Sequence, residues 1–342
     1  MIQADFTAVA VAALAAGVPD CRRRIQPGPV TQRAERIVSV QPKYAGTVCK
    51  VAVRYLWCGA PGAPTVIVQG GISASRDAVT LGADEQPGWW QELVGHGRAV
   101  DLDHCRVLAI DWVTANELGA AAVSSEDQAD ILAALLLELG IAAVQGFVGA
   151  SYGAMVGLAF AARHPRAVER LVLLAGAHKA HPLAAGQRSV QRQIVRLGQS
   201  CGRVDDALAL ARQLAITTYR GSEEFAQRFS GAPELRDDGF HFPVEDYLCH
   251  QGRRFVERFD ADRFLTLSES IDLHDVAPER ITTPATLIGF ASDRLVPLAD
   301  ICELQQRLRG PATLTVVASP YGHDGFLKET GQLAPLLREA LA

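Results

Sequence analysis

The feature that most constrains the fold of this chain is the run at residues 149–153, which reads GASYG. It has the form G-x-S-x-G, in which a serine stands at a sharp turn between a strand and a helix. Residues 144–148 (VQGFV) predict a short buried strand, and residues 154–163 (AMVGLAFAAR) predict a helix of small residues that ends before Pro165. The flanking glycines leave room for the turn and for close packing of the helix on the strand. Ser151 is therefore a candidate nucleophile, with its hydroxyl pointing out of the fold.

A serine hydroxyl becomes a good nucleophile only when a base takes its proton. In folds with this turn, an acid and then a histidine follow the serine along the chain. Asp293 lies in the segment 291–297, just past a predicted strand at residues 285–290, and His323 follows a predicted last strand at residues 312–318. We therefore predict a catalytic triad in which His323 is the base. Asp293 would fix the tautomer of the imidazole and stabilise the imidazolium.

An oxyanion hole needs two amide donors that face the reacting carbonyl. One is expected from Tyr152, the residue after the candidate nucleophile. The other is expected from Ile72, in the glycine-rich loop that follows a predicted strand at residues 65–69. Both amides would then lie beside the serine hydroxyl.

The elements along the chain alternate between strands and helices. Strands are predicted at residues 35–41, 48–57, 65–69, 106–110, 170–175, 285–290 and 312–318. A capping-box helix is predicted from Ser125 to Leu139. This order predicts an α/β-hydrolase fold, with a mostly parallel central sheet and helices on both faces. Residues 178–279 show little strand signal, so we expect a helical lid between the core segments 35–177 and 280–342.

Charge and cysteine usage exclude several functions. A net charge of −5 provides no basic surface for nucleic acid or for an anionic membrane. The seven cysteines are scattered singly, without the Cys/His spacing of a metal site, which favours reduced thiols in a cytoplasm and no metal. Residues 6–18 are apolar, but Asp5 precedes them and no basic stretch does. We therefore expect a short amphipathic helix or a poorly ordered leader within residues 1–34, rather than a signal peptide.

One further segment carries a family resemblance. Residues 88–101 read GWWQELVGHGRAVD and resemble the G-W-W-x-x-[LI]-[VI]-G-P-G-x-A-[LI]-D motif of the homoserine O-acyltransferase family of α/β-hydrolase folds. His96 stands where that family usually has proline. The resemblance spans about residues 35–340. The other matching segments are Gly149–Gly153, Leu171–Ala175, Thr218–Arg220, Ser292–Asp293 and Gly322–Asp324.

The resemblance implies an enzyme with a ping-pong reaction in methionine biosynthesis. Ser151 would take an acyl group from acyl-CoA, and the hydroxyl of homoserine would then attack the acyl-enzyme. Acyl-CoA is a co-substrate in this scheme, and no permanently bound cofactor is implied. Arg220 would bind the carboxylate of the acceptor, Asp324 its ammonium group, and Tyr219 would contact the substrate. We also expect a homodimer.

The acyl donor is indicated by residues 70–74, which read GGISA and look more like the succinyl-transferring members of the family. The free carboxylate of a succinyl group requires a nearby cation. Arg294, beside the acid of the triad, and Arg76, beside the oxyanion loop, are the candidates. Acetyl-CoA as donor and serine as acceptor remain open.

Two other classes of function compete with acyl transfer. An esterase or amidase would use the same triad with water as acceptor, but it has no need for Arg220 and Asp324 as a paired reader of an amino acid. A non-catalytic binding module of the same fold has no need for the triad. Covalent labelling of Ser151 separates that alternative from both enzymes.

Overall fold

The computed structural model describes residues 31–82, 86–237 and 239–342. Residues 1–30 of the predicted leader at residues 1–34, and with them the helix expected over residues 6–18, lie outside the described residues. The first described element is a strand that already begins at Thr31.

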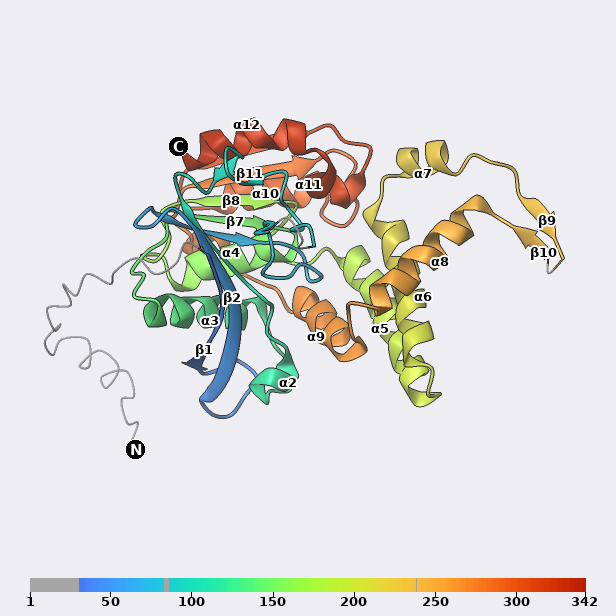
Figure 1. The fold of residues 1–342 in the computed structure, drawn as a ribbon, viewed down its shortest axis with the longest axis horizontal. Helices are drawn as coiled ribbons and strands as arrows, with labels where there is room; N and C mark the ends of the chain where they lie inside the picture. Colours follow the sequence, from blue (N-terminus) through green and yellow to red (C-terminus); the bar gives the residue numbers. More distant parts are fainter. Residues whose placement is uncertain (1–30, 83–85, 238) are drawn as a thin grey trace, which may run out of the picture.

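One sheet of eight strands forms the centre of the molecule, in the order β1-β2-β6-β3-β7-β8-β11-β12 (Figure 1). Its strands are β1 (Thr31–Val40), β2 (Cys49–Gly59), β3 (Thr65–Gln69), β6 (Arg106–Ile110), β7 (Gly146–Ala150), β8 (Leu171–Leu174), β11 (Ala285–Phe290) and β12 (Ala312–Val317). The pairs β1–β2 and β2–β6 are antiparallel, and every other neighbouring pair is parallel. All residues of β3, β7 and β8 are buried, as expected for parallel strands that are covered on both faces. The predicted mostly parallel sheet is confirmed.

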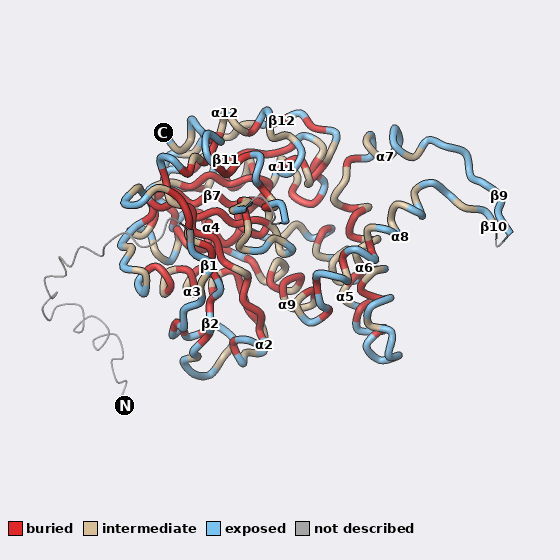
Figure 2. The backbone as a smooth tube through the Cα atoms, viewed as in Figure 1, coloured by how far each residue is buried: buried red, intermediate tan, exposed pale blue. Residues whose placement is uncertain are grey.

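Helices cover the two faces of this sheet, and the sheet separates the core into two buried clusters (Figures 1 and 2). On one face lie α3 (Ser125–Glu138), α4 (Tyr152–Arg163) and α10 (Leu298–Arg307), whose apolar side chains join one buried cluster. On the other face α12 (Thr330–Leu341) contributes Leu333 and Leu337 to a second cluster. The remaining short elements are β4 (Val94–Gly95), β5 (Val100–Asp101), α2 (Ala115–Leu118), η1 (Pro278–Arg280), η2 (Gly322–Asp324) and α11 (Gly325–Lys328).

A group of helices and a hairpin is inserted between β8 and β11, and we call it the α5–α9 segment. It consists of α5 (Pro182–Ser200), α6 (Val204–Tyr219), α7 (Ser222–Arg228), β9 (Glu234–Arg236), β10 (Gly239–His241), α8 (Pro243–Val256) and α9 (Ala261–Asp272). The α7–β9–β10 part reaches away from the rest of the molecule (Figure 1). The β9–β10 hairpin corrects the expectation of helices alone. Its strands are three residues long and mostly exposed, so they leave no alternating apolar pattern to detect.

The N-terminal boundaries of two elements differ from the predicted ones. The N-cap of α3 is Ser124, one residue before the predicted start, because its hydroxyl accepts the Asp127 amide while the Asp127 carboxylate accepts the Ser124 amide. The strand before Ser151 is β7, which begins two residues after the predicted start and continues to Ala150. Among the described residues, no helix is long and apolar enough to cross a membrane.

Candidate active site

Ser151 occupies a backbone conformation that L-residues rarely adopt, with φ at 56° and ψ at −118°. The turn around it requires glycine on both sides. A Cβ at Gly153 would lie 2.2 Å from the carbonyl oxygen of Gln69, and one at Gly149 would lie 2.4 Å from the carbonyl oxygen of Gly153. The Ser151 amide donates to the carbonyl of Leu174 in the neighbouring strand, at 2.9 Å. The sheet therefore holds the turn in place against its strain.

The structure brings Ser151, Asp293 and His323 together in one hydrogen-bonded chain. Nε2 of His323 lies 2.8 Å from Oγ of Ser151, and Nδ1 of His323 lies 2.7 Å from Oδ2 of Asp293. The second carboxylate oxygen of Asp293 accepts the amides of Leu295 and Val296, at 2.8 and 3.1 Å. These bonds fix the carboxylate, so the imidazole faces the serine hydroxyl with its other nitrogen.

The surroundings of His323 shift the pKa of its imidazole. Burial lowers the pKa of His323, but the charge of Asp293 and the hydrogen bond to it outweigh this, and the pKa ends above its ordinary value. A raised pKa makes the imidazole a stronger proton acceptor, and the neutral form that acts as base dominates only above that pKa.

Ser292 ties the loop of Asp293 to the loop of His323. Its hydroxyl donates to the carbonyl of Ser319 and accepts the amide of Gly322. Asp293 and His323 come from the loops after β11 and β12, and the bonds of Ser292 hold these two loops together.

The predicted oxyanion amides lie beside the nucleophile. Tyr152 is the first residue of α4, so its amide has no acceptor within the helix. A Cβ at Gly71, the residue before Ile72, would lie 3.8 Å from Oγ of Ser151, which places the loop after β3 against the serine. The loop is held by two indoles. Nε1 of Trp112 donates to the carbonyl of Gly71, at 3.0 Å, and Nε1 of Trp89 donates to that of Ser75, at 2.9 Å.

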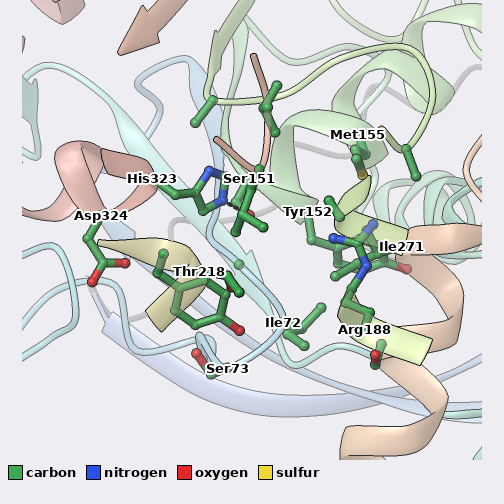
Figure 3. A pocket seen from close by; sticks show the side chains of 18 of the residues that line it. Ile72, Ser73, Ser151, Tyr152, Met155, Arg188, Thr218, Ile271, His323 and Asp324 are labelled. Atoms are coloured by element: carbon green, nitrogen blue, oxygen red, sulfur yellow. Dashed lines mark hydrogen bonds between the residues drawn. The ribbon is translucent and has the colours of Figure 1, made fainter. Parts of the chain in front are cut away.

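A cavity of about 200 Å³ opens above the serine, between the sheet and the α5–α9 segment (Figure 3). Ser151 and His323 lie on one side of it, and Arg188 lies on another side near Tyr152 and Ile271. The predicted site residues on its wall are Ile72, Ser151, Tyr152, Tyr219, His323 and Asp324. The polar residues of the wall to which the sequence assigned no role are Ser73, Lys179, His181, Gln187, Arg188, Gln191, Arg212, Thr218, Ser268 and Asp300.

Arg188 is the cation on this wall with the clearest setting. Its guanidinium contacts Asp272 at 2.7 Å, and Arg192, which does not line the cavity, contacts the same carboxylate at 2.6 Å. Two positive charges therefore share one negative charge, and the excess lies next to the cavity. Arg212 also lines the cavity, with its guanidinium 5.3 Å from the ring centroid of Tyr219 and 4.8 Å from that of Phe255. Neither arginine belongs to one of the segments that resemble the family.

Arg220 and Asp324 lie together as an ion pair. Nε of Arg220 contacts the Asp324 carboxylate at 2.9 Å, and Nη1 of Arg220 contacts Glu224 at 3.0 Å. Asp324 lines the cavity, whereas Arg220 is not among its lining residues.

The two arginines predicted to read a succinyl carboxylate do not reach the cavity. Arg76 lies over Asp111, with 3.6 Å between guanidinium and carboxylate, and Arg294 donates to the carbonyl of Thr217 at 3.1 Å. Neither side chain is among the residues that line the cavity, so their predicted contact with a succinyl carboxylate stays a prediction that this geometry does not support.

The tryptophans at residues 89 and 90 have different positions. Trp89 lines the cavity, while Trp90 is 2% exposed and its Nε1 donates to the carbonyl of Phe326 at 2.9 Å. Within the described part of the chain, no cluster of three or more His, Cys, Asp or Glu side chains is arranged to hold a metal ion.

Comparisons with known proteins agree with this geometry. Residues 64–330 match the model of the alpha/beta hydrolase fold family. The homoserine O-succinyltransferase of Xanthomonas campestris pv. campestris is 44% identical over 92% of this chain and 85% of that protein. The serine O-succinyltransferase of Litchfieldella anticariensis is 30% identical over 95% of this chain and 99% of that protein. The crystal structure of homoserine O-acetyltransferase from Bacillus anthracis superposes with a TM-score of 0.81 at 17% identity, covering 92% of this chain and 98% of that one.

Proposed function

The chain belongs to the homoserine O-acyltransferase family of the α/β-hydrolase fold, and on that premise we propose that it transfers an acyl group, preferably succinyl, from acyl-CoA to the hydroxyl of L-homoserine. The observation that carries the proposal is the hydrogen-bonded chain from Ser151 through His323 to Asp293, which opens into a cavity lined by arginines of the inserted segment. The inserted α5–α9 segment acts as the lid that excludes water from this cavity.

In the first half-reaction, Oγ of Ser151 attacks the thioester carbonyl while Nε2 of His323 takes the hydroxyl proton. The carbonyl oxygen becomes an oxyanion that the amides of Ile72 and Tyr152 stabilise. The bond to sulfur then breaks, the imidazolium of His323 returns the proton to the leaving thiolate, and CoA departs as a thiol. The acyl group remains as an ester on Ser151.

In the second half-reaction, the homoserine hydroxyl takes the place of CoA. His323 removes its proton as the oxygen attacks the acyl-enzyme, and the same amides hold the second oxyanion. When the ester bond to Ser151 breaks, His323 gives the proton back to the serine oxygen. The product is an O-acyl amino acid, and the enzyme regains its starting protonation state.

The Arg220–Asp324 ion pair suits a zwitterionic acceptor. An amino acid carries one carboxylate and one ammonium group, so it can insert between the guanidinium and the carboxylate and give each a new partner of opposite charge. Neither side chain is then left buried without a partner, which would be costly. We therefore retain Arg220 as the carboxylate reader and Asp324 as the ammonium reader, with Tyr219 beside them.

The preference for succinyl is supported by Arg188, which replaces Arg76 and Arg294 as the candidate reader of the distal carboxylate. Its side chain is 12% exposed and lies on the cavity wall. Such a partly buried guanidinium favours a ligand carboxylate over the methyl group of an acetyl donor.

The remaining features of the proposal follow from the family. The reaction would belong to methionine biosynthesis, and the six described cysteines, all free thiols, suit the cytoplasm. No permanently bound cofactor is required, since acyl-CoA is consumed in each turnover. We also propose that the protein acts as a homodimer.

Intact-mass spectrometry after mixing with succinyl-CoA in the absence of acceptor tests the covalent step. We expect a succinyl adduct on the wild type, its loss when L-homoserine is added, and no adduct on Ser151→Ala, because covalent catalysis has no other route. CoA release by Ser151→Ala should fall by about three orders of magnitude or more. CoA release that is equally fast without homoserine would instead favour hydrolysis, and an adduct on Ser151→Ala would overturn the assignment of the nucleophile.

A further inference from the structure

We propose that Trp112 is a positioning residue of the oxyanion hole, which aims the Ile72 amide and supports the backbone of Tyr152 at the same time. The inference rests on the proposed function only in that both need acyl transfer through Ser151. Trp112 is 1% exposed, does not line the cavity, and lies two residues after the end of β6. Any effect it has on the reaction must therefore pass through other residues.

The topology of the sheet brings Trp112 to this place. β6, β3 and β7 are adjacent and parallel, so their carboxyl ends meet at one edge of the sheet. β6 leads to Trp112, β3 leads to the oxyanion loop, and β7 leads to Ser151 and Tyr152. The indole thus lies next to both chain segments from which the oxyanion donors come.

The first contact sets the direction of the Ile72 amide. Nε1 of Trp112 donates to the carbonyl oxygen of Gly71, at 3.0 Å. That carbonyl and the N–H of Ile72 belong to one planar trans peptide group, so they point in opposite directions. A bond that fixes the oxygen therefore also fixes where the N–H points. It polarises the peptide as well, which makes the N–H a stronger donor.

The second contact acts on the other donor. The ring of Trp112 packs edge-to-face on that of Tyr152, with 4.9 Å between centroids and an angle of 72° between the planes. The phenol oxygen of Tyr152 lies 2.5 Å from Oγ of Ser270, so the far end of this side chain is also held. One indole therefore constrains the backbone on both sides of the position where the oxyanion would form.

The variant Trp112→Phe removes the N–H but keeps an aromatic ring. Trp90→Phe is a matched control, because Trp90 is equally buried and its indole also donates to a main-chain carbonyl, that of Phe326. A role in packing alone would lower thermal stability in both variants and reduce the fraction of active enzyme, but it would leave the rate constant per labelled serine unchanged. Rates are therefore measured per active site, titrated by covalent labelling of Ser151.

We expect Trp112→Phe to slow serine acylation and deacylation by about 10- to 100-fold, somewhat less than the loss of an entire oxyanion donor. KM for homoserine should stay unchanged, since Trp112 touches no substrate, and Trp90→Phe should keep its rate constants within about twofold of the wild type. If Trp112→Phe fails to fold, tryptophan at residue 112 can be replaced by its benzothiophene isostere, which has the same shape and no N–H donor. Rate constants equal to those of the control would overturn the proposal.

Acylation is measured with p-nitrophenyl acetate as well as with succinyl-CoA. Any acyl transfer through Ser151 forms an oxyanion, so the loss in Trp112→Phe should appear with both reagents. A wild type that reacts with the ester but not with succinyl-CoA would contradict the proposed donor, while the comparison of the two variants on the ester would still test Trp112.

Discussion

Single charged side chains on the cavity wall carry the proposed choice of acyl donor. Arg188 and Arg192 share Asp272, but only Arg188 lines the cavity, and we propose that its excess positive charge favours a donor with a free carboxylate. Arg294 donates to a main-chain carbonyl outside the cavity. Arg188 is therefore the residue proposed to bind the carboxylate of the donor, and Arg192 is its matched control. Arg294 is a candidate that the sequence had suggested for the same role.

We expect Arg188→Gln to lower kcat/KM for succinyl-CoA by about tenfold or more, which corresponds to about 1.4 kcal/mol, because the carboxylate of the donor loses a charge-assisted contact. Activity with acetyl-CoA should change by about twofold at most, since the acetyl group makes no such contact. Steady-state kinetics with both donors provide the measurement. Arg192→Gln, which also loosens Asp272, and Arg294→Ala should keep the ratio of the two donors unchanged. A ratio unaffected by Arg188→Gln would exclude this role.

The sequence predicted the residues whose place follows from a strand end. Ser151 directly follows β7, and Asp293 and His323 lie in the loops that follow β11 and β12, so the order of strands along the chain sufficed to bring the three together. Arg188 could not be found in this way, because it lies on a helix of the inserted segment and its direction depends on how that helix packs. Adjacency to Asp293 in sequence could not show that the guanidinium of Arg294 donates to the carbonyl of Thr217, because the direction of a long side chain depends on tertiary packing.

At the scale of elements, buried polar contacts attach the end of the α5–α9 segment to the core. Just after α9, His274 is 2% exposed, with Nδ1 2.7 Å from Oγ of Ser125 in α3 and Nε2 3.1 Å from the carbonyl of Ala177. Nε2 must donate to the carbonyl, and in the neutral imidazole, which the lowered pKa favours, Nδ1 accepts from the serine. Burial lowers the pKa of His274 to about 3.

This lowered pKa predicts a loss of stability in acid. Below about pH 6.5 the unfolded chain binds a proton at His274 that the folded chain refuses until about pH 3, so the free energy of unfolding falls by up to about 1.4 kcal/mol per pH unit in that window. We expect His274→Asn to be less stable than the wild type at neutral pH, because the imidazole contacts are lost, but to show a weaker pH dependence in the acid window. Urea unfolding at several pH values measures both.

His104→Asn is the control for this measurement, because the His104 side chain is 85% exposed. Its pH dependence should match that of the wild type. Equal slopes for the wild type and His274→Asn would show that His274 does not titrate as described.

The accuracy of the predicted elements depended on burial. The strands at residues 65–69, 106–110 and 285–290 were predicted with the bounds that the structure has, because each is a short apolar run covered on both faces. The β9–β10 hairpin was missed because its strands are only three residues long and mostly exposed. Tertiary contacts, rather than a local pattern, decide such a segment.

At the scale of the whole molecule, the α7–β9–β10 part carries apolar side chains into solvent. Leu235 and Phe240 are 72% and 63% exposed on the part that reaches farthest from the sheet (Figure 1). Exposed apolar groups gathered in this way indicate a contact surface, and a second copy of the chain is the partner that we expect.

We predict a dimer in size-exclusion chromatography with light scattering at micromolar concentration. The double variant Leu235→Glu, Phe240→Glu should shift the equilibrium toward the monomer, because it places charges in the interface. Leu137→Glu is the control, since Leu137 is 77% exposed on α3, a helix that covers the central sheet and is not part of the α7–β9–β10 part. A monomeric wild type, or a dimer that only Leu137→Glu weakens, would contradict this prediction.

The order of the sheet also has a consequence for protein synthesis. The nucleophile leaves the ribosome with β7 in the middle of the chain, whereas its base follows β12, the last strand to be made. The nascent chain therefore carries Ser151 without its base for the whole time during which the inserted segment and the last two strands are being translated. Without His323 that serine is an ordinary alcohol, so the growing polypeptide cannot be acylated by cellular thioesters before the sheet is complete.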